Sequence, residues 1–237
     1  LGGVGKRTAM RLAFSVVDMT EAEAAVSFMD LSVEAECFGA KVHFSDHEVP
    51  TVVGRLINDA DEAEALSVPA IGSARTGIYI EAVKKAAQKI TDRPVFAGII
   101  GPFSLAARLL DVTEIMMDCY DDPDMVHTVL EKVTAFLIEY AKAYKAVGAN
   151  GIVMAEPLAG LLSPDLEETF SAPYVKEIID AVQDDSFAVI YHNCGPNIAD
   201  MTESLAKNGA AAHRKAKGFS RRTPLPYGTN GIVEFSF

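Results

Sequence analysis

The sequence predicts an α/β fold, a (β/α)8 TIM-type barrel that is either complete or lacks some strands. Short apolar runs alternate with longer stretches of helical periodicity, which is typical of a parallel sheet with covered faces. This alternation fits a barrel or a doubly wound sheet. Polar residues recur just after the expected strands, and in a barrel those strand ends meet at one mouth, so a barrel is favoured. The length of 237 residues suits one domain spanning residues 1–237.

Five segments have the short apolar pattern of strands. They are 25–29, 41–44, 95–100, 151–155 and 187–191. The first ends at Asp30, the third at a Gly-Pro turn (residues 101–102), the fourth at Glu156 and the fifth at His192. The predicted strand ends therefore carry side chains capable of acid–base or metal chemistry.

The helices are predicted from apolar residues spaced three and four apart. The longest begins at Asp122 and Pro123, which suit a first turn, and ends at Gly148. The others are 33–38, 59–66, 75–90, 173–182 and 198–207. Pro94 stops the helix at 75–90 before the next strand begins, because proline cannot continue a helix.

Composition narrows the class of protein. The apolar content is 49% and the formal charge is −12, which predicts an acidic enzyme that binds neither nucleic acid nor an anionic membrane. Three scattered cysteines are too few for a secreted disulfide framework. No apolar run approaches the roughly 20 residues that span a bilayer. We therefore expect a cytoplasmic protein.

One short motif combines an imidazole with a thiol. His192 and Cys194 lie two positions apart, directly after the apolar run 187–190. In an extended chain such residues project to the same side, and zinc accepts nitrogen and thiolate ligands together. The alternative is a core histidine beside an inert buried cysteine, which is the commoner meaning of an isolated His-x-Cys pair.

Three further segments resemble the uroporphyrinogen decarboxylase superfamily in their order and spacing. They are Phe28-Met29-Asp30-Leu31, the Gly-Pro-Phe-type turn at 101–106 and the segment at 156–164. With the His-x-Cys pair, the chain is most similar to the branch that transfers methyl groups from methylcobamide to coenzyme M. The resemblance covers residues 25–209 and implies a TIM barrel. Residues 213–237 form an atypical tail, which leaves open whether the barrel is complete.

The resemblance implies a zinc-dependent methyltransferase. Its methyl donor would be a methylated corrinoid (methylcobamide) on a partner corrinoid protein, and its acceptor a small-molecule thiol such as coenzyme M. In this branch a His-x-Cys motif and a later cysteine hold zinc, and His192 and Cys194 match the first two ligands. No cysteine follows Cys194, so Glu156, His213 or water would complete the site. Glu156 is otherwise a solvated or ion-paired carboxylate.

Two other functions remain open. A decarboxylase of porphyrin biosynthesis has the same fold, and the resemblance implies that the aspartate matching Asp30 would face the pyrrole nitrogens without any metal. Alternatively, the chain is an inactive or fragmentary barrel that acts only as a binding partner. Exposed apolar surface at missing strands would then favour a homodimer.

Asp30 and Arg75 each have two interpretations. Asp30 is catalytic by its family position, or it caps the helix at 33–38, where it could share a face with Glu34. Arg75 binds an anionic group such as the coenzyme sulfonate, or it forms a surface salt bridge, which is the commoner role.

Overall fold

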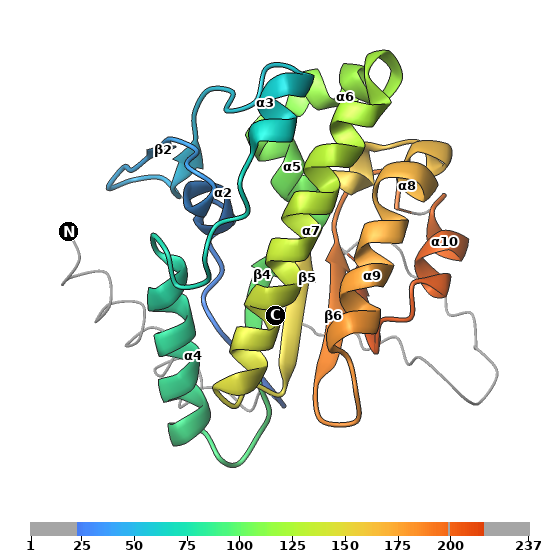
Figure 1. The fold of residues 1–237 in the computed structure, drawn as a ribbon. Helices are drawn as coiled ribbons and strands as arrows, with labels where there is room; N and C mark the ends of the chain where they lie inside the picture. The colour runs from blue at the N-terminus through green and yellow to red at the C-terminus, as the bar shows by residue number, and fades with distance from the viewer. Residues whose placement is uncertain (1–22, 199, 216–237) are drawn as a thin grey trace.

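Five parallel strands form the main sheet of the protein (Figure 1). The computed structural model describes residues 23–198 and 200–215. The strands are β1 (Ala25–Val26), β4 (Val95–Ile100), β5 (Gly151–Ala155), β6 (Ala188–Asn193) and β7 (Ala212–Lys215). They lie in the order β1-β4-β5-β6-β7, so each strand pairs with the next sheet strand along the chain.

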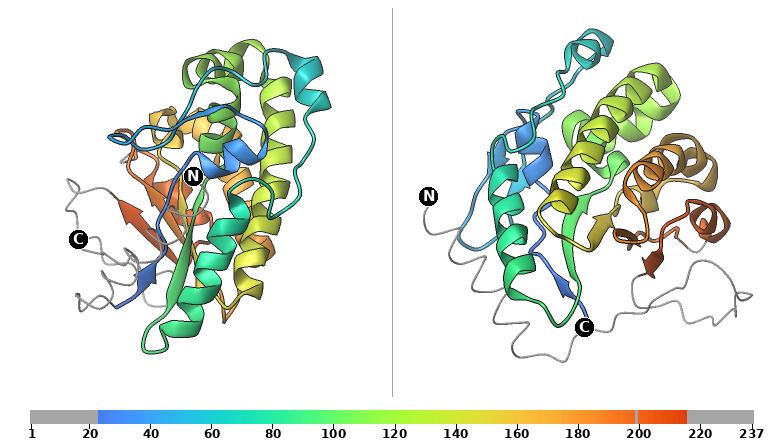
Figure 2. Two further views of the ribbon diagram at one scale, coloured as in Figure 1. Left: turned by 90° about the vertical axis from the view of Figure 1, so that its left-hand side faces the viewer. Right: turned by 60° about the horizontal axis from the view of Figure 1, so that its bottom comes forward.

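The connecting helices gather on one face of this sheet, as the views in Figure 1 and Figure 2 agree. They are α2 (Val33–Cys37), α3 (Ala60–Ala65), α4 (Thr76–Lys89), α5 (Pro102–Leu110), α6 (Val112–Asp121), α7 (Pro123–Ala146), the 3-10 helix η1 (Ala159–Leu161), α8 (Pro164–Phe170), α9 (Ala172–Val182) and α10 (Thr202–Lys207). A doubly wound sheet would carry helices on both faces. Strands in sequential order with helices on one side are the arrangement of a barrel wall, which confirms the predicted fold class. The described strands make up part of such a wall.

The two faces of the sheet differ in what covers them. Met154 and Val189 belong to the large core beneath the helices, whereas Val153 and Ile190 belong to a second, smaller apolar cluster. Successive side chains of a strand point to opposite faces, so the second cluster lies on the face away from the helices. His192 is two positions beyond Ile190 and shares that face.

Helix α7 is the main support of the helical layer. Asp122 accepts a hydrogen bond from the Met125 N–H (3.2 Å) and Pro123 occupies the first turn, as the sequence predicts. Farther along, Phe136 is fully buried and meets Phe38 edge to face, with ring centroids 5.1 Å apart. This contact attaches the segment after α2 to α7, and α2 carries part of the candidate site.

Several predicted boundaries are wrong. The first strand ends at Val26 rather than residue 29, and the last helix begins at Thr202 rather than residue 198. The strand predicted at 187–191 continues to Asn193, so His192 lies within β6 and not after it. The turn predicted at residues 101–102 is the first turn of α5, with Pro102 at the helix start.

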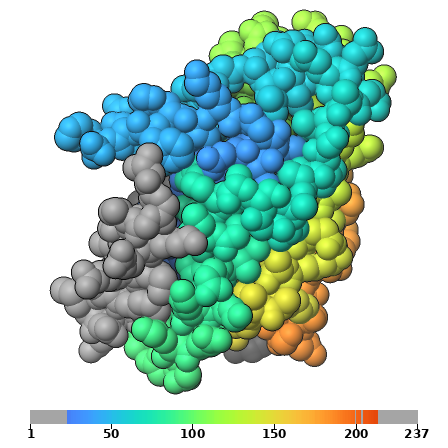
Figure 3. Space-filling view, turned by 60° about the vertical axis from the view of Figure 1, so that its left-hand side comes forward, coloured from blue at the N-terminus to red at the C-terminus, as the bar shows by residue number. Residues whose placement is uncertain are grey.

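The segment predicted as a strand at 41–44 is outside the main sheet. Residues Val42–His43 form β2, which pairs antiparallel with β3 (Thr51–Val52) in a two-stranded hairpin. Residues 43–49 between and beside these strands are exposed, and the hairpin projects from the body of the molecule (Figure 3).

Helices α5, α6 and α8 and strand β7 have no counterpart in the prediction. Residues 102–107 at the start of α5 are all buried, so they show no apolar periodicity. Strand β7 takes up residues 213–215, which were assigned to the atypical tail, and pairs with β6. The rest of that tail lies outside the described residues. No helix in the described ranges is both long enough and apolar enough to cross a membrane.

Replacing Phe136 with alanine is expected to lower the free energy of unfolding by about 3–5 kcal/mol, because the ring is fully buried against Phe38. The half-exposed Lys142, on the same helix, is the control, and Lys142→Ala should change stability by less than about 0.5 kcal/mol. Urea denaturation of both variants measures this. A loss below about 1 kcal/mol for Phe136→Ala would contradict the packing described.

Candidate functional site

The carboxyl ends of three strands meet at one edge of the sheet. The register places Ile100 of β4 beside Ala155 of β5, and Ala155 beside His192 of β6. Two backbone hydrogen bonds close this row: Gly101 N–H donates to the Ala155 carbonyl (2.7 Å) and Glu156 N–H donates to the His192 carbonyl (2.8 Å). Residues that follow these strand ends are therefore held close together.

Glu156 is fully buried and faces helix α5. Its Oε1 accepts the Ser104 N–H at 2.6 Å and its Oε2 accepts the Phe103 N–H at 3.1 Å. A side chain on Gly101 would overlap this carboxylate, so the approach requires glycine there. The carboxylate occupies the positive end of the helix dipole. Burial nevertheless raises the pKa of Glu156 to about 7, and hydrogen bonds from Ser104 and Phe103 oppose that rise.

Glu34, on α2, is a second buried carboxyl at this edge. Its Oε1 accepts the Ile100 N–H at 3.2 Å. Its Oε2 is buried and has no hydrogen-bond partner within the described part of the chain. Burial raises the pKa of Glu34 from 4.5 to about 7, and Asp30 adds to the rise while Arg108 opposes it. The backbone around the β4–α5 turn thus donates to two carboxylates from different parts of the chain.

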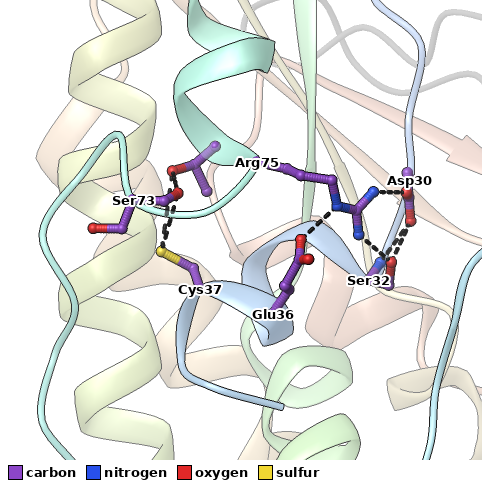
Figure 4. Close-up of polar contacts among 7 residues, drawn as sticks. Asp30, Ser32, Glu36, Cys37, Ser73 and Arg75 are labelled. Atoms are coloured by element: carbon purple, nitrogen blue, oxygen red, sulfur yellow. Dashed lines mark hydrogen bonds and ion pairs between the residues drawn. The ribbon is translucent and has the colours of Figure 1, made fainter. Parts of the chain in front are cut away.

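Asp30 and Arg75 contact each other directly (Figure 4). The Asp30 side chain is 4% exposed, and its Oδ1 accepts hydrogen bonds from the Ser32 N–H (2.9 Å) and hydroxyl (2.7 Å). Ser32 is the residue before α2, so Asp30 stabilises the approach to the helix without being its cap. The catalytic role of Asp30 stays a prediction.

Arg75 lies in a closed network of partners. Besides Asp30, it pairs with Glu36, donates to the Ser32 hydroxyl (2.8 Å) and lies over the Phe44 ring at 4.9 Å from its centroid. Burial lowers the pKa of Arg75, but the hydrogen bonds and charges of Asp30 and Glu36 together raise it above its usual value. The structure therefore contains the salt bridge considered for Arg75. Its use by a ligand anion stays a prediction.

His192 lies on the opposite face of the sheet from Glu156, and Cys194 follows the end of β6. His192 is partly buried on the face away from the helices, and Cys194 is exposed after the end of β6. Between them Asn193 is fully buried, and its Oδ1 accepts the Gly195 N–H at 2.9 Å. This bond fixes the turn that carries the thiol.

The donor set at this edge fits a zinc ion only in part. An imidazole and a thiol two positions apart suit zinc, which needs three or four protein ligands. Among the side chains that the structure describes, which do not include those of residues 203 and 213–215, no three from His, Cys, Asp or Glu form a group able to hold a metal. Both oxygens of Glu156 are bound by α5 amides. Of the predicted ligands, His192 and Cys194 are therefore the two left for zinc among the described side chains, and the side chain of His213 lies outside them.

Two residues of this edge were missed from sequence. Ser104 donates its N–H to Glu156, and its hydroxyl accepts the Leu158 N–H at 3.0 Å, which attaches the segment after β5 to α5. Arg108 donates to the Ser104 carbonyl at 3.0 Å. Arg108 is the single charged residue in the stretch 102–110, and that isolation is the signal that the sequence offers.

Residues 6–215 match the uroporphyrinogen decarboxylase (URO-D) family. The chain belongs to this family. It is 28% identical over 192 residues to methylcobamide:CoM methyltransferase MtbA of Methanosarcina acetivorans, covering 78% of this chain and 56% of that protein. It is 30% identical over 198 residues to uroporphyrinogen decarboxylase of Desulfotalea psychrophila, covering 79% and 57%. The chain therefore spans little more than half the length of these relatives.

Two solved structures resemble this chain. A methyltransferase from Methanosarcina mazei superposes with a TM-score of 0.80 at 25% identity, over 88% of this chain and 62% of that one. A B12-independent methionine synthase from Shewanella sp. W3-18-1 superposes with a TM-score of 0.56 at 17% identity, over 89% and 62%, and is similar in fold alone.

Glu156→Gln is expected to destabilise the protein by about 1–3 kcal/mol, because the amide nitrogen of glutamine would face a backbone N–H of α5. Glu139→Gln, on the exposed face of α7, is the matched control and should stay within about 0.5 kcal/mol of the parent. Thermal and urea denaturation compare the two. Equal stabilities would show that α5 does not depend on this carboxylate.

Glu34 should give the protein a specific dependence of stability on pH. Because its pKa is raised in the folded state, its contribution is fully present below pH 4.5 and is lost as the pH rises through about 7. Glu34→Gln removes this dependence. The stability of the parent relative to Glu34→Gln should therefore fall by on the order of 3 kcal/mol between about pH 5 and about pH 8.

Urea denaturation at both pH values measures that difference. Glu156 titrates in both proteins, so its contribution cancels. Glu81→Gln, at an exposed position of α4, is the control and should show no such change. A difference that is independent of pH would mean that Glu34 is not a buried titrating group.

Proposed function

We propose that this chain is part of an enzyme that transfers a methyl group from a methylated corrinoid, carried on a partner corrinoid protein, to a small-molecule thiol such as coenzyme M. The thiol sulfur takes the methyl group, the electrons of the cobalt–carbon bond stay on cobalt, and the thiol proton is released. The relatives named as methyltransferases support this reaction class. Three free cysteines fit a cytoplasmic location.

The observation that carries this proposal is the placement of His192 and Cys194. The imidazole lies at the carboxyl end of β6, on the face that a barrel turns inward, and the exposed thiol follows at once. Asn193, buried between them, holds the turn through Gly195. Both residues therefore lie at the edge where barrel enzymes bind substrates.

We include zinc in the proposal, with His192 and Cys194 as two of its ligands. Bound zinc lowers the pKa of a coordinated thiol and leaves a sulfur nucleophile at neutral pH. Glu156 is the weaker candidate for a third ligand, because binding zinc would require it to release the Phe103 and Ser104 amides.

Decarboxylation of uroporphyrinogen is the second candidate, supported by the relative at 30% identity. It would rely on Asp30. In this structure the Asp30 carboxylate is nearly buried and already bound by Arg75 and Ser32. Presenting it to pyrrole nitrogens would require breaking those bonds, so the methyltransferase is favoured.

Elemental analysis of the purified chain is expected to find about one zinc per chain, and His192→Ala and Cys194→Ser should each lose it, since catalytic zinc needs every ligand. Cys119→Ser is the matched control, because Cys119 is buried in α6 and has no part in the motif. Methyl transfer from methylcobalamin to coenzyme M, followed by the absorbance of the corrinoid, should decline in the same variants.

A folded chain without zinc would overturn the zinc-dependent mechanism. Turnover of uroporphyrinogen by zinc-free protein, abolished by Asp30→Asn, would assign the decarboxylase instead. Neither metal nor turnover with either substrate would support a barrel that acts only as a binding partner.

A further inference from the structure

Two arginines lie near the carboxyl edge of the sheet, and their surroundings differ. Arg75 is bound by Asp30, Glu36 and Ser32. Arg108, on α5, forms one hydrogen bond, to the carbonyl of Ser104, and no ion pair with any carboxylate of the described residues. A guanidinium has five N–H donors, so most of those on Arg108 are not used by the described chain.

Helix geometry directs Arg108 to this edge. Side chains on a helix lean toward its N-terminus, and the Arg108 guanidinium reaches back one turn to the Ser104 carbonyl. Helix α5 begins directly after β4, so this direction is toward the carboxyl ends of the strands. Arg108 is partly buried and retains some contact with solvent.

The carboxylates around Arg108 do not neutralise it by contact. Glu156 is held by the Phe103 and Ser104 amides, Glu34 by the Ile100 amide, and Asp30 by Arg75. Burial lowers the pKa of Arg108. The negative charges of Glu156, Glu34 and Asp30 raise it again, but not back to the usual value of an arginine. For Arg75, by contrast, the hydrogen bonds and charges of Asp30 and Glu36 raise the pKa by more than burial lowers it. Arg108 is thus a desolvated cation whose charge is compensated only at a distance.

We propose that Arg108 binds an oxyanion of a small-molecule ligand, a sulfonate or a carboxylate, at the carboxyl edge of the sheet. A planar guanidinium with free donors suits the paired oxygens of such groups. The positive end of α5 cannot serve this purpose, because Glu156 already fills it. Arg108 is therefore proposed for the anion-binding role that the sequence suggested for Arg75.

The inference does not rest on the proposed methyl transfer. Calorimetric titration of the whole chain with sodium ethanesulfonate and with sodium propionate tests it directly. The buffer is Tris chloride at low, constant ionic strength, because sulfonate buffers would compete and salt screens the interaction. The parent should bind at least one of these anions saturably.

Arg108→Gln should weaken that binding at least about tenfold, or about 1.4 kcal/mol, and Arg108→Lys should weaken it less. The control is Arg55→Gln, because Arg55 is a partly buried arginine of another cluster, paired with Glu114 and Asp118. It should bind like the parent. Stronger binding of ethanesulfonate would favour a sulfonated thiol, and stronger binding of propionate a substrate with carboxylate arms; both support the site.

A second measurement uses only the parent protein, so its result does not depend on whether the variants fold. Phenylglyoxal modifies accessible arginines, and peptide mapping locates the modified residue. Saturating probe should slow modification of Arg108 while leaving that of Arg75 unchanged. The proposal is overturned if neither anion binds saturably, if Arg108→Gln binds as the parent does, or if the probe fails to protect Arg108.

Discussion

Parallel pairing of β4, β5 and β6 aligns Ile100, Ala155 and His192 in one row, and the groups of the candidate site are placed relative to that row. Glu34 accepts a hydrogen bond from the Ile100 N–H. Glu156 is the first residue after β5, and its carboxylate accepts a hydrogen bond from the Ser104 N–H of α5. A shift of one residue in the register would turn each strand's side chains to the opposite face. The chemistry at this edge therefore depends on the same backbone hydrogen bonds that hold the sheet.

Buried ionisable groups at this edge are stabilised in two ways, by ion pairing and by backbone amides. Asp30 and Arg75 neutralise each other by direct contact, which stabilises both ions. Glu34 and Glu156 are instead held by backbone amides, and burial raises the pKa of each to about 7. Arg108 lies near these groups without contacting them. This edge therefore buries two carboxyl groups with raised pKa values beside a cation, Arg108, that keeps some contact with solvent.

Periodic elements were predictable and densely buried ones were not. Helix α7 has an apolar stripe, a proline in its first turn and a glycine just past its end, and these local signals locate it correctly. Helix α5 was not predicted because its first six residues are all buried, so the sequence shows no periodic contrast between an apolar and a polar face. Strand β7 was not predicted because its basic and polar residues lack the apolar pattern of a strand. Its strand conformation depends on pairing with β6.

By itself, the sequence determined the alternation of strands and helices, the family, and the proximity of His192 to Cys194, because these depend on local spacing along the chain. Tertiary structure decided which charges meet. Arg75 is 45 residues from Asp30, and Glu34 is 66 residues from the Ile100 amide. Such pairs form only when the sheet brings distant segments together. No pattern within one segment specifies that Glu156 faces α5, or that Arg108 is left with unused donors.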